Sequence, residues 1–185
     1  GKTVYLAAVT SDIQTGREKL MRELSDRGHR VLPDRPLPTS GDEFTEAVRD
    51  MLGQADYSIH LVGQKYGMIP EDAAHSIAKI QNDLATEQVQ AGGDFARFIW
   101  MPRPIVTDDD RQQQFITELR ENPQSHAGAE LMEDSLDNFR DYVVEKLKPK
   151  PKPAPTTIPA LGTPSADGAA TVYLIFDPKD DETVA

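Results

Sequence analysis

The sequence predicts an α/β fold, a doubly wound sheet of five parallel strands with helices on both faces. Two observations predict it. Short apolar runs alternate five times with segments of helical periodicity over roughly the first 145 residues. The apolar runs lack the in–out alternation of a half-exposed strand, which indicates strands buried on both faces. Strands that alternate with helices are typical of a parallel sheet with helical crossovers.

The first strand is predicted at residues 4–9, where the run is almost wholly apolar. Ser11 and Asp12 are residue types that cap helices, and the apolar spacing predicts a helix over residues 13–27. Gly28 follows in the position where a glycine commonly ends a helix. A second short strand is predicted at residues 30–32.

The middle of the chain repeats this order twice. Asp42 is the expected cap of a helix over residues 43–52, and a strand follows at residues 57–63. The next helix is predicted over residues 73–91. A fourth strand is predicted at residues 97–101.

The last unit begins with a helix capped by the acidic run 108–110 and ending near residue 121. A weak strand is predicted at residues 129–132. Asp134 or Ser135 is expected to cap the final helix, which keeps an apolar stripe from Leu136 to Leu147. The complete series predicts a flavodoxin-like sheet.

Composition excludes several classes of function. The chain has 185 residues, a net charge of −11 and no cysteine, so disulfides, thiolate chemistry and cysteine–zinc sites are excluded. The acidity argues against binding to nucleic acid or to an anionic membrane. The four histidines have no metal-ligand spacing, so no metal site is expected. No apolar run has the length of a membrane span and no signal peptide is evident, which predicts a cytoplasmic protein.

Ligands of doubly wound sheets bind beyond the carboxyl ends of the strands. Three of the four loops there are longer than a minimal turn: residues 33–41, 63–71 and 102–107. Gly63 and Gly67 form only a GxxxG, which is more typical of a flexible loop than of a phosphate cradle. Nucleotide-binding fingerprints and a nucleophile elbow are absent from the sequence, and the third strand lacks the terminal aspartate of a phosphoryl acceptor.

The helix that follows Pro70 carries the main candidates. Ser76, Ile80, Asp83 and Glu87 are spaced 4, 3 and 4, so they share one face. A carboxylate at the rim of the sheet can bond ribose hydroxyls or stabilise an oxocarbenium-like sugar. The spacing alone is more typical of a solvated acidic face on an ordinary helix.

Other single residues have two interpretations. Trp100 lies within a strand and is expected in the core, although near the strand end it could stack on a planar ring. Tyr66 lies in a loop and is the better candidate for an exposed ring. Arg35 and Arg103 lie in rim loops and could bind phosphate. His60 alternates with apolar residues and is expected in the core.

Several short strings together resemble bacterial TIR (Toll/interleukin-1 receptor) domains over about residues 2–148. They are TVYLAAVTSD, RELSDRGHRVLP, ADYSIHLVGQKYG, SIAKIQNDLA and RFIWMP. The resemblance implies that the chain cleaves NAD⁺ as a substrate, without a cofactor, to nicotinamide and ADP-ribose or a cyclic isomer. It also implies activation by self-assembly with other TIR domains and a role in bacterial anti-phage immunity.

The key residue of that family is a glutamate on the third helix. Ser76 matches the serine that precedes it, and the acid position falls nearest Asp83, with Gln81 and Glu87 as the other registers. An aspartate is one methylene shorter and a glutamine carries no charge, so the departure also admits an inactive module that only assembles.

The resemblance places further residues around the NAD⁺. Val9, Thr10 and Asp12 would line the pocket, and Tyr66 and Trp100 are candidates for ring contacts, with Arg35 for phosphate. A third hypothesis is an enzyme similar to nucleoside deoxyribosyltransferases, which also attack an N-glycosidic bond through a glutamate.

The string TVYL occurs twice, at Thr3 and at Thr171. A proline-rich stretch at residues 149–170 is expected to be an extended linker. The sequence therefore predicts a TIR-like domain over residues 1–148, the linker, and at 171–185 the first strand of a second, truncated TIR-like domain. A regulatory domain or partner is expected beyond the linker, with an edge strand on the first sheet as the alternative.

Overall fold

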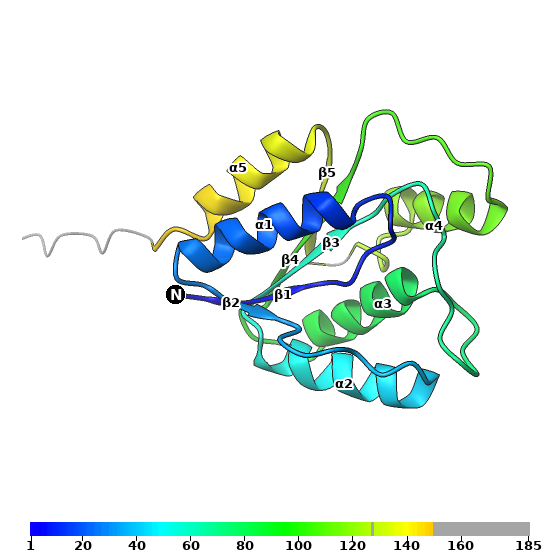
Figure 1. Ribbon diagram of the computed structural model, residues 1–185, viewed down its shortest axis with the longest axis horizontal. Helices are drawn as coiled ribbons and strands as arrows, with labels where there is room; N and C mark the ends of the chain where they lie inside the picture. Colours follow the sequence, from blue (N-terminus) through cyan, green and yellow to red (C-terminus); the bar gives the residue numbers. More distant parts are fainter. Residues whose placement is uncertain (127, 150–185) are drawn as a thin grey trace, which may run out of the picture. The chain divides into compact units, whose positions relative to one another are not determined.

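The computed structural model describes residues 1–126 and 128–149 (Figure 1). The chain divides into two units, Gly1–Lys148 and Pro149–Ala185, and all the helices and strands described belong to the first. Apart from Pro149, the predicted linker and the predicted strand at 171–185 lie outside the described residues. No helix among the described residues is long and apolar enough to cross a membrane.

Five strands and five helices alternate along the described chain, which confirms the predicted order. The strands are β1 (Thr3–Leu6), β2 (Arg30–Leu32), β3 (Tyr57–Leu61), β4 (Ala96–Met101) and β5 (Ala129–Glu133). The helices are α1 (Gln14–Asp26), α2 (Gly41–Gln54), α3 (Ile77–Gln90), α4 (Asp110–Glu121) and α5 (Leu136–Lys146).

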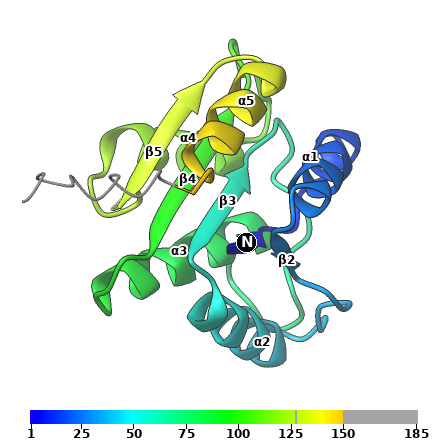
Figure 2. The ribbon, with the colours of Figure 1, turned by 90° about the vertical axis from the view of Figure 1, so that its left-hand side faces the viewer.

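The strands form one parallel sheet in the order β2-β1-β3-β4-β5, which confirms the doubly wound α/β fold. Helices α1 and α5 cover one face, and α2, α3 and α4 cover the other (Figures 1 and 2). The central strands β1, β3 and β4 are therefore buried on both faces, which explains their continuous apolar runs.

Asp109 caps α4 and Ser135 caps α5, as predicted, whereas the starts of the first three helices differ from the prediction. Ser40, and not Asp42, caps α2, since its hydroxyl accepts the N–H of Glu43. Ser76 caps α3 in the same way, so that helix begins four residues later than predicted. Asp12 does not cap α1, because its carboxylate binds another loop. β1 also ends at Leu6, three residues earlier than predicted.

β3 carries two polar residues into the interior. Ser58 and His60 are buried, and the Ser58 hydroxyl lies 2.9 Å from Nε2 of His60. Burial lowers the pKa of His60 well below its ordinary value, and the nearby charge of Arg97 lowers it further. The folded chain therefore holds this imidazole neutral, as expected for a core histidine.

This burial predicts a loss of stability in mild acid. Below about pH 6.5 His60 binds a proton in the unfolded chain but stays neutral in the folded chain. The free energy of unfolding is therefore expected to fall by up to about 1.4 kcal/mol per pH unit below that point. Urea unfolding of wild type and His60→Gln between pH 7.5 and 5 measures this slope, which the variant should lack. The exposed His75→Gln is the control; equal slopes in all three chains would contradict the prediction.

Candidate functional site

The strand order reverses between β1 and β3, so the loops after these two strands meet at the carboxyl edge of the sheet. The structure joins them through Asp12. Its Oδ2 accepts the backbone N–H of Gln64 at 2.8 Å, and its Oδ1 accepts the Thr10 hydroxyl. The ammonium of Lys65 donates to the Ser11 hydroxyl at 2.8 Å. Thr10 and Asp12, which were predicted to line a pocket, bind each other and the neighbouring loop.

The two glycines of the β3–α3 loop permit this close contact. A Cβ on Gly63 would lie 2.3 Å from Oδ2 of Asp12, and one on Gly67 would lie 2.5 Å from Cγ2 of Thr10. Gly67 also has a φ of +83°, which disfavours other residues. These glycines therefore admit side chains of the first loop rather than a phosphate.

Gln81 is the candidate of α3 that reaches the end of β1. Its Oε1 accepts the Tyr5 hydroxyl at 2.6 Å and the Ala8 N–H at 2.8 Å. Its Nε2 donates to the carbonyls of Ala8 and Ile77, both at 3.0 Å. The side chain is fully buried, and these four bonds use its hydrogen-bonding capacity. At this place the chain has a neutral structural amide instead of an acid.

The two acids of α3 lie away from that edge. Glu87 is exposed and pairs with Arg49 of α2 at 3.3 Å. Asp83 lies 3.4 Å from Nζ of Lys79, which also lies 3.2 Å from Oε1 of Glu118 on α4. The predicted common face of α3 is therefore divided between its two neighbouring helices.

In the cluster formed by Lys79, Asp83 and Glu118, burial and charge shift the pKa values of Asp83 and Lys79. Burial raises the pKa of Asp83, and the attraction of Lys79 offsets this only in part. Burial alone would lower the pKa of Lys79, but Asp83 and Glu118 together raise it. Two carboxylates that share one ammonium keep that lysine charged.

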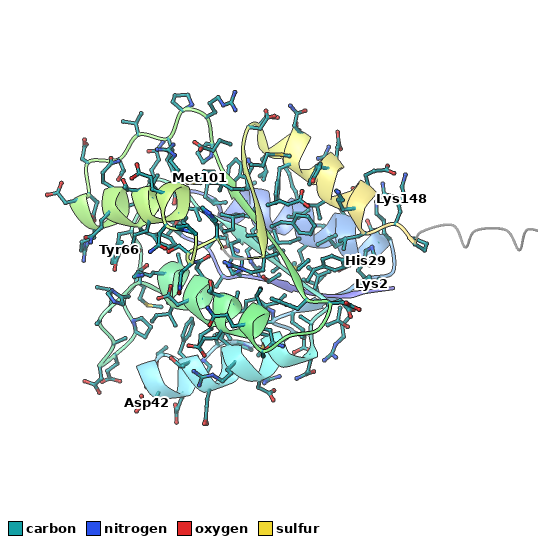
Figure 3. All side chains as sticks on the ribbon, turned by 180° about the vertical axis from the view of Figure 1, so that it is seen from behind. Lys2, His29, Asp42, Tyr66, Met101 and Lys148 are labelled. Atoms are coloured by element: carbon teal, nitrogen blue, oxygen red, sulfur yellow. The ribbon has the colours of Figure 1, made fainter. Side chains whose placement is uncertain are left out.

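A pocket of about 260 Å³ lies between α3 and α4, beside this cluster. Tyr66 of the β3–α3 loop is one of the residues that line it; Figure 3 labels this residue beside α4. The other residues that line it are Ala74, His75, Lys79, Arg111, Gln114, Phe115 and Glu118. Two cations, Lys79 and Arg111, line this pocket. Lys79 is paired with Asp83 and Glu118, and Arg111 is paired with Asp109, so an anionic ligand would compete with these carboxylates for the cations.

Arg111 is held in place at the entrance to α4. Its Nε and one Nη donate to Asp109 at 3.2 and 2.9 Å, and the Asp109 carboxylate also caps the helix. Hydrogen bonding from Arg111 is the main reason that the pKa of Asp109 falls to about 2. The Asp109 carboxyl is therefore ionised at neutral pH.

Tyr66 is not the exposed ring that the sequence predicted, because only 5% of it is accessible. Its hydroxyl accepts the N–H of Ser76 at 3.2 Å. The guanidinium carbon of Arg111 lies 4.4 Å from the ring centroid, so this face is covered. The structure therefore brings Tyr66 and Ser76 together at the pocket wall.

The remaining candidates lie elsewhere. Trp100 is buried in the core on the α1–α5 face, and its indole N–H donates to the Asp134 carbonyl at 2.9 Å. Val9 packs against the same core. Arg35 is exposed in the loop after β2, 3.6 Å from the Asp34 carboxylate. None of these three lines the pocket between α3 and α4.

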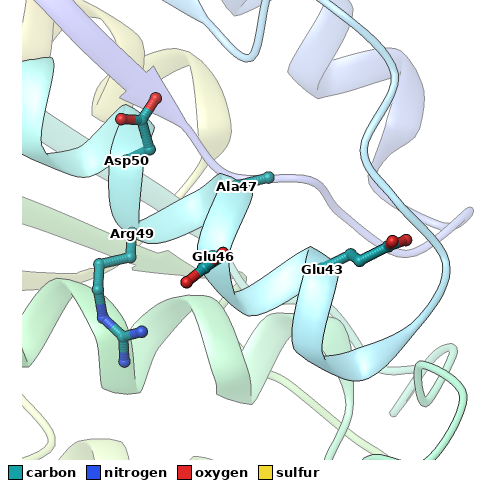
Figure 4. A pocket seen from close by; sticks show the side chains of 5 residues that line it. All are labelled: Glu43, Glu46, Ala47, Arg49 and Asp50. Atoms are coloured by element: carbon teal, nitrogen blue, oxygen red, sulfur yellow. The ribbon is translucent and has the colours of Figure 1, made fainter.

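A wider hollow of about 580 Å³ lies along α2 (Figure 4). Its charged lining consists of Glu43, Glu46, Asp50 and Arg49, and Arg49 is paired with Glu87. The excess of carboxylates would repel a phosphate. Among the described residues, no group of three or more acidic or histidine side chains could hold a metal ion.

Sequence reasoning missed Glu118, Arg111 and Lys79. Lys79 and Asp83 carry a weak signal, since i,i+4 spacing places them side by side on a helix. Glu118 and Arg111 lie on a different helix, and only the packing of α4 against α3 brings them to the pocket.

No protein-family model and no curated protein matches the chain. Among solved structures, a Clostridium botulinum CMP N-glycosidase, BcmB, is similar, with a TM-score of 0.50 and 15% sequence identity. The match covers 79% of this chain and 100% of that chain. At this identity the similarity shows a shared fold.

Proposed function

We propose that this chain is an N-glycosidase that acts on a nucleotide, with NAD⁺ as the first substrate to test. The observation that carries the proposal is the pocket between α3 and α4, which Lys79, Arg111 and Glu118 line together, with the Lys79 ammonium 3.2 Å from Glu118. Guanidinium and ammonium groups bind phosphate, and a nearby carboxylate stabilises an oxocarbenium-like sugar. The fold shared with a CMP N-glycosidase is compatible with this chemistry.

The proposed reaction breaks the bond between C1′ of the ribose and the base nitrogen. With NAD⁺ the electron pair of that bond neutralises the pyridinium, so nicotinamide leaves without a proton from an acid. The carboxylate of Glu118 stabilises the positive charge at C1′, water adds there, and its proton passes to solvent or to the carboxylate. Lys79 and Arg111 bind the pyrophosphate.

NAD⁺ is preferred among nucleotides because the short strings quoted above resemble TIR domains. On the same ground we propose that the chain is TIR-like, that self-assembly with other TIR domains activates it, and that it serves in anti-phage defence. ADP-ribose or a cyclic isomer is the proposed second product.

A second candidate is a TIR-like module that assembles and has no catalytic activity. Gln81 favours it, because the α3 side chain nearest the end of β1 is neutral and fully bonded. A deoxyribosyltransferase-like enzyme remains a third hypothesis, which exchange of bases between deoxynucleosides would support.

The test is nicotinamide release from NAD⁺ by concentrated or crowded protein, compared with Asp83→Ala and Glu87→Ala. Asp83→Ala is expected to lower the rate about ten-fold, because Lys79 loses one of its two carboxylates. Glu87→Ala should keep the wild-type rate, since Glu87 pairs with α2. The enzymatic proposal would be contradicted, and the assembly module favoured, if the protein released neither nicotinamide from NAD⁺ nor cytosine from CMP under any assembling condition.

A further inference from the structure

Tyr66 contacts both helices that form the pocket. Its hydroxyl accepts the N–H of Ser76 at the start of α3, and its ring lies beneath Arg111 of α4. The residue is almost fully buried although it belongs to a loop. One side chain therefore joins two helices that are separate in the sequence.

On the α4 side, the ring adds a second contact to a cation that is otherwise held only by Asp109. The Arg111 side chain is 59% exposed, and a long exposed side chain samples many rotamers. Asp109 binds one edge of the guanidinium, and the Tyr66 ring lies against its face. Together they fix the plane of the group that lines the pocket.

On the α3 side, the hydroxyl acts on the first turn. Ser76 is fully buried, and its own hydroxyl accepts the N–H of Lys79 at 3.3 Å. The Lys79 ammonium in turn lies 3.2 Å from Glu118. A continuous series of contacts therefore runs from the Tyr66 hydroxyl to the carboxylate in the pocket.

The backbone next to Tyr66 is itself held. Gly67 has a positive φ and lies against the methyl group of Thr10, and the neighbouring Gln64 N–H is bound by Asp12. The loop backbone therefore holds the Tyr66 ring in place through contacts that do not involve Arg111.

We propose that Tyr66 is a positioning residue of this pocket. Its ring orients Arg111 toward the phosphate of the substrate, and its hydroxyl orients the first turn of α3 and, through Lys79, the carboxylate of Glu118. This inference rests on the proposed function. It assigns separable effects to two parts of one side chain, the ring acting on affinity and the hydroxyl on turnover.

The experiment compares Tyr66→Phe with Tyr66→Leu in the full chain. Inorganic pyrophosphate is the probe of the cations, measured by calorimetry, and nicotinamide release gives kcat and KM. Tyr66→Phe should bind pyrophosphate within about two-fold of wild type but show a kcat about five-fold lower. Tyr66→Leu should in addition bind pyrophosphate roughly five-fold more weakly, since the cation loses its aromatic support.

Tyr142→Leu is the matched control. It removes a ring that lies under Lys146 on α5, with Nζ 5.3 Å from the centroid, and it should change neither quantity. Thermal unfolding verifies that each variant is folded. Should Tyr66→Leu not fold, Tyr66→Phe decides, and an unchanged kcat overturns the inference.

The two proposals fail in different measurements. Wild-type pyrophosphate affinity in folded Tyr66→Leu, or no pyrophosphate binding by the wild type, overturns the positioning role. If the wild type and Tyr66→Phe bind pyrophosphate more tightly than Tyr66→Leu, but the wild type cleaves no nucleotide, only the proposed function is overturned. The effect of the ring on affinity then stands.

Discussion

Glu118→Gln is expected to lower nicotinamide release from NAD⁺ about 100-fold, with a much smaller change in KM. Glutamine has nearly the same shape as glutamate but lacks the charge that stabilises an oxocarbenium-like C1′. Lys79 keeps its contact with Asp83, so the pocket should hold its form. Steady-state kinetics with purified protein under assembling conditions measures the effect.

Glu121→Gln on the same helix provides the control, because that side chain is exposed and does not line the pocket. It should retain the wild-type rate. If both variants are equally active, the carboxylate in the pocket is not the group that acts on the sugar, and the α3–α4 pocket is not the site.

Gln81→Glu is expected to destabilise the fold by about 3 kcal/mol at pH 7 without creating activity. The new carboxylate would face the carbonyl oxygens of Ala8 and Ile77, to which the amide now donates. The loss should shrink toward pH 5, because protonation of the acid restores one donor. Urea unfolding at both pH values, with an NAD⁺ cleavage assay, tests this.

Gln90→Glu is the control on the same helix. Gln90 is exposed at the end of α3, so the substitution should cost no more than about 0.5 kcal/mol. A stable Gln81→Glu chain that gains NAD⁺ cleavage would contradict our account. It would move the site to the end of β1 and make the natural chain a disabled enzyme.

The order of strands and helices was predictable because it depends on local patterns. Apolar runs such as Tyr57–Leu61 must be buried on both faces, and helices with one apolar stripe must cover them. Helix starts were less predictable, since Ser40, Asp42 and Asp12 are all capping residue types. Which of them binds a free helix N–H depends on where the preceding loop runs.

The site was predictable only in part. The sequence indicated α3 and the loops at the carboxyl edge, and the structure does bring Ser76 and Tyr66 together there. It also shows that Gln81 is a structural amide and that Asp83 faces α4. Helical spacing defines a face of a helix, but it does not say which neighbour lies against that face.

The sequence by itself determined the fold class, since the apolar composition of the central strands indicates burial on both faces and helical segments alternate with all five strands. It also determined that thiol chemistry is excluded and that an anionic ligand requires local cations. Only the tertiary structure decided which charges meet, because Lys79, Arg111 and Glu118 come from two helices. Their proximity follows from the packing of α3 and α4 side by side on one face of the sheet. No periodicity along the chain encodes that distance.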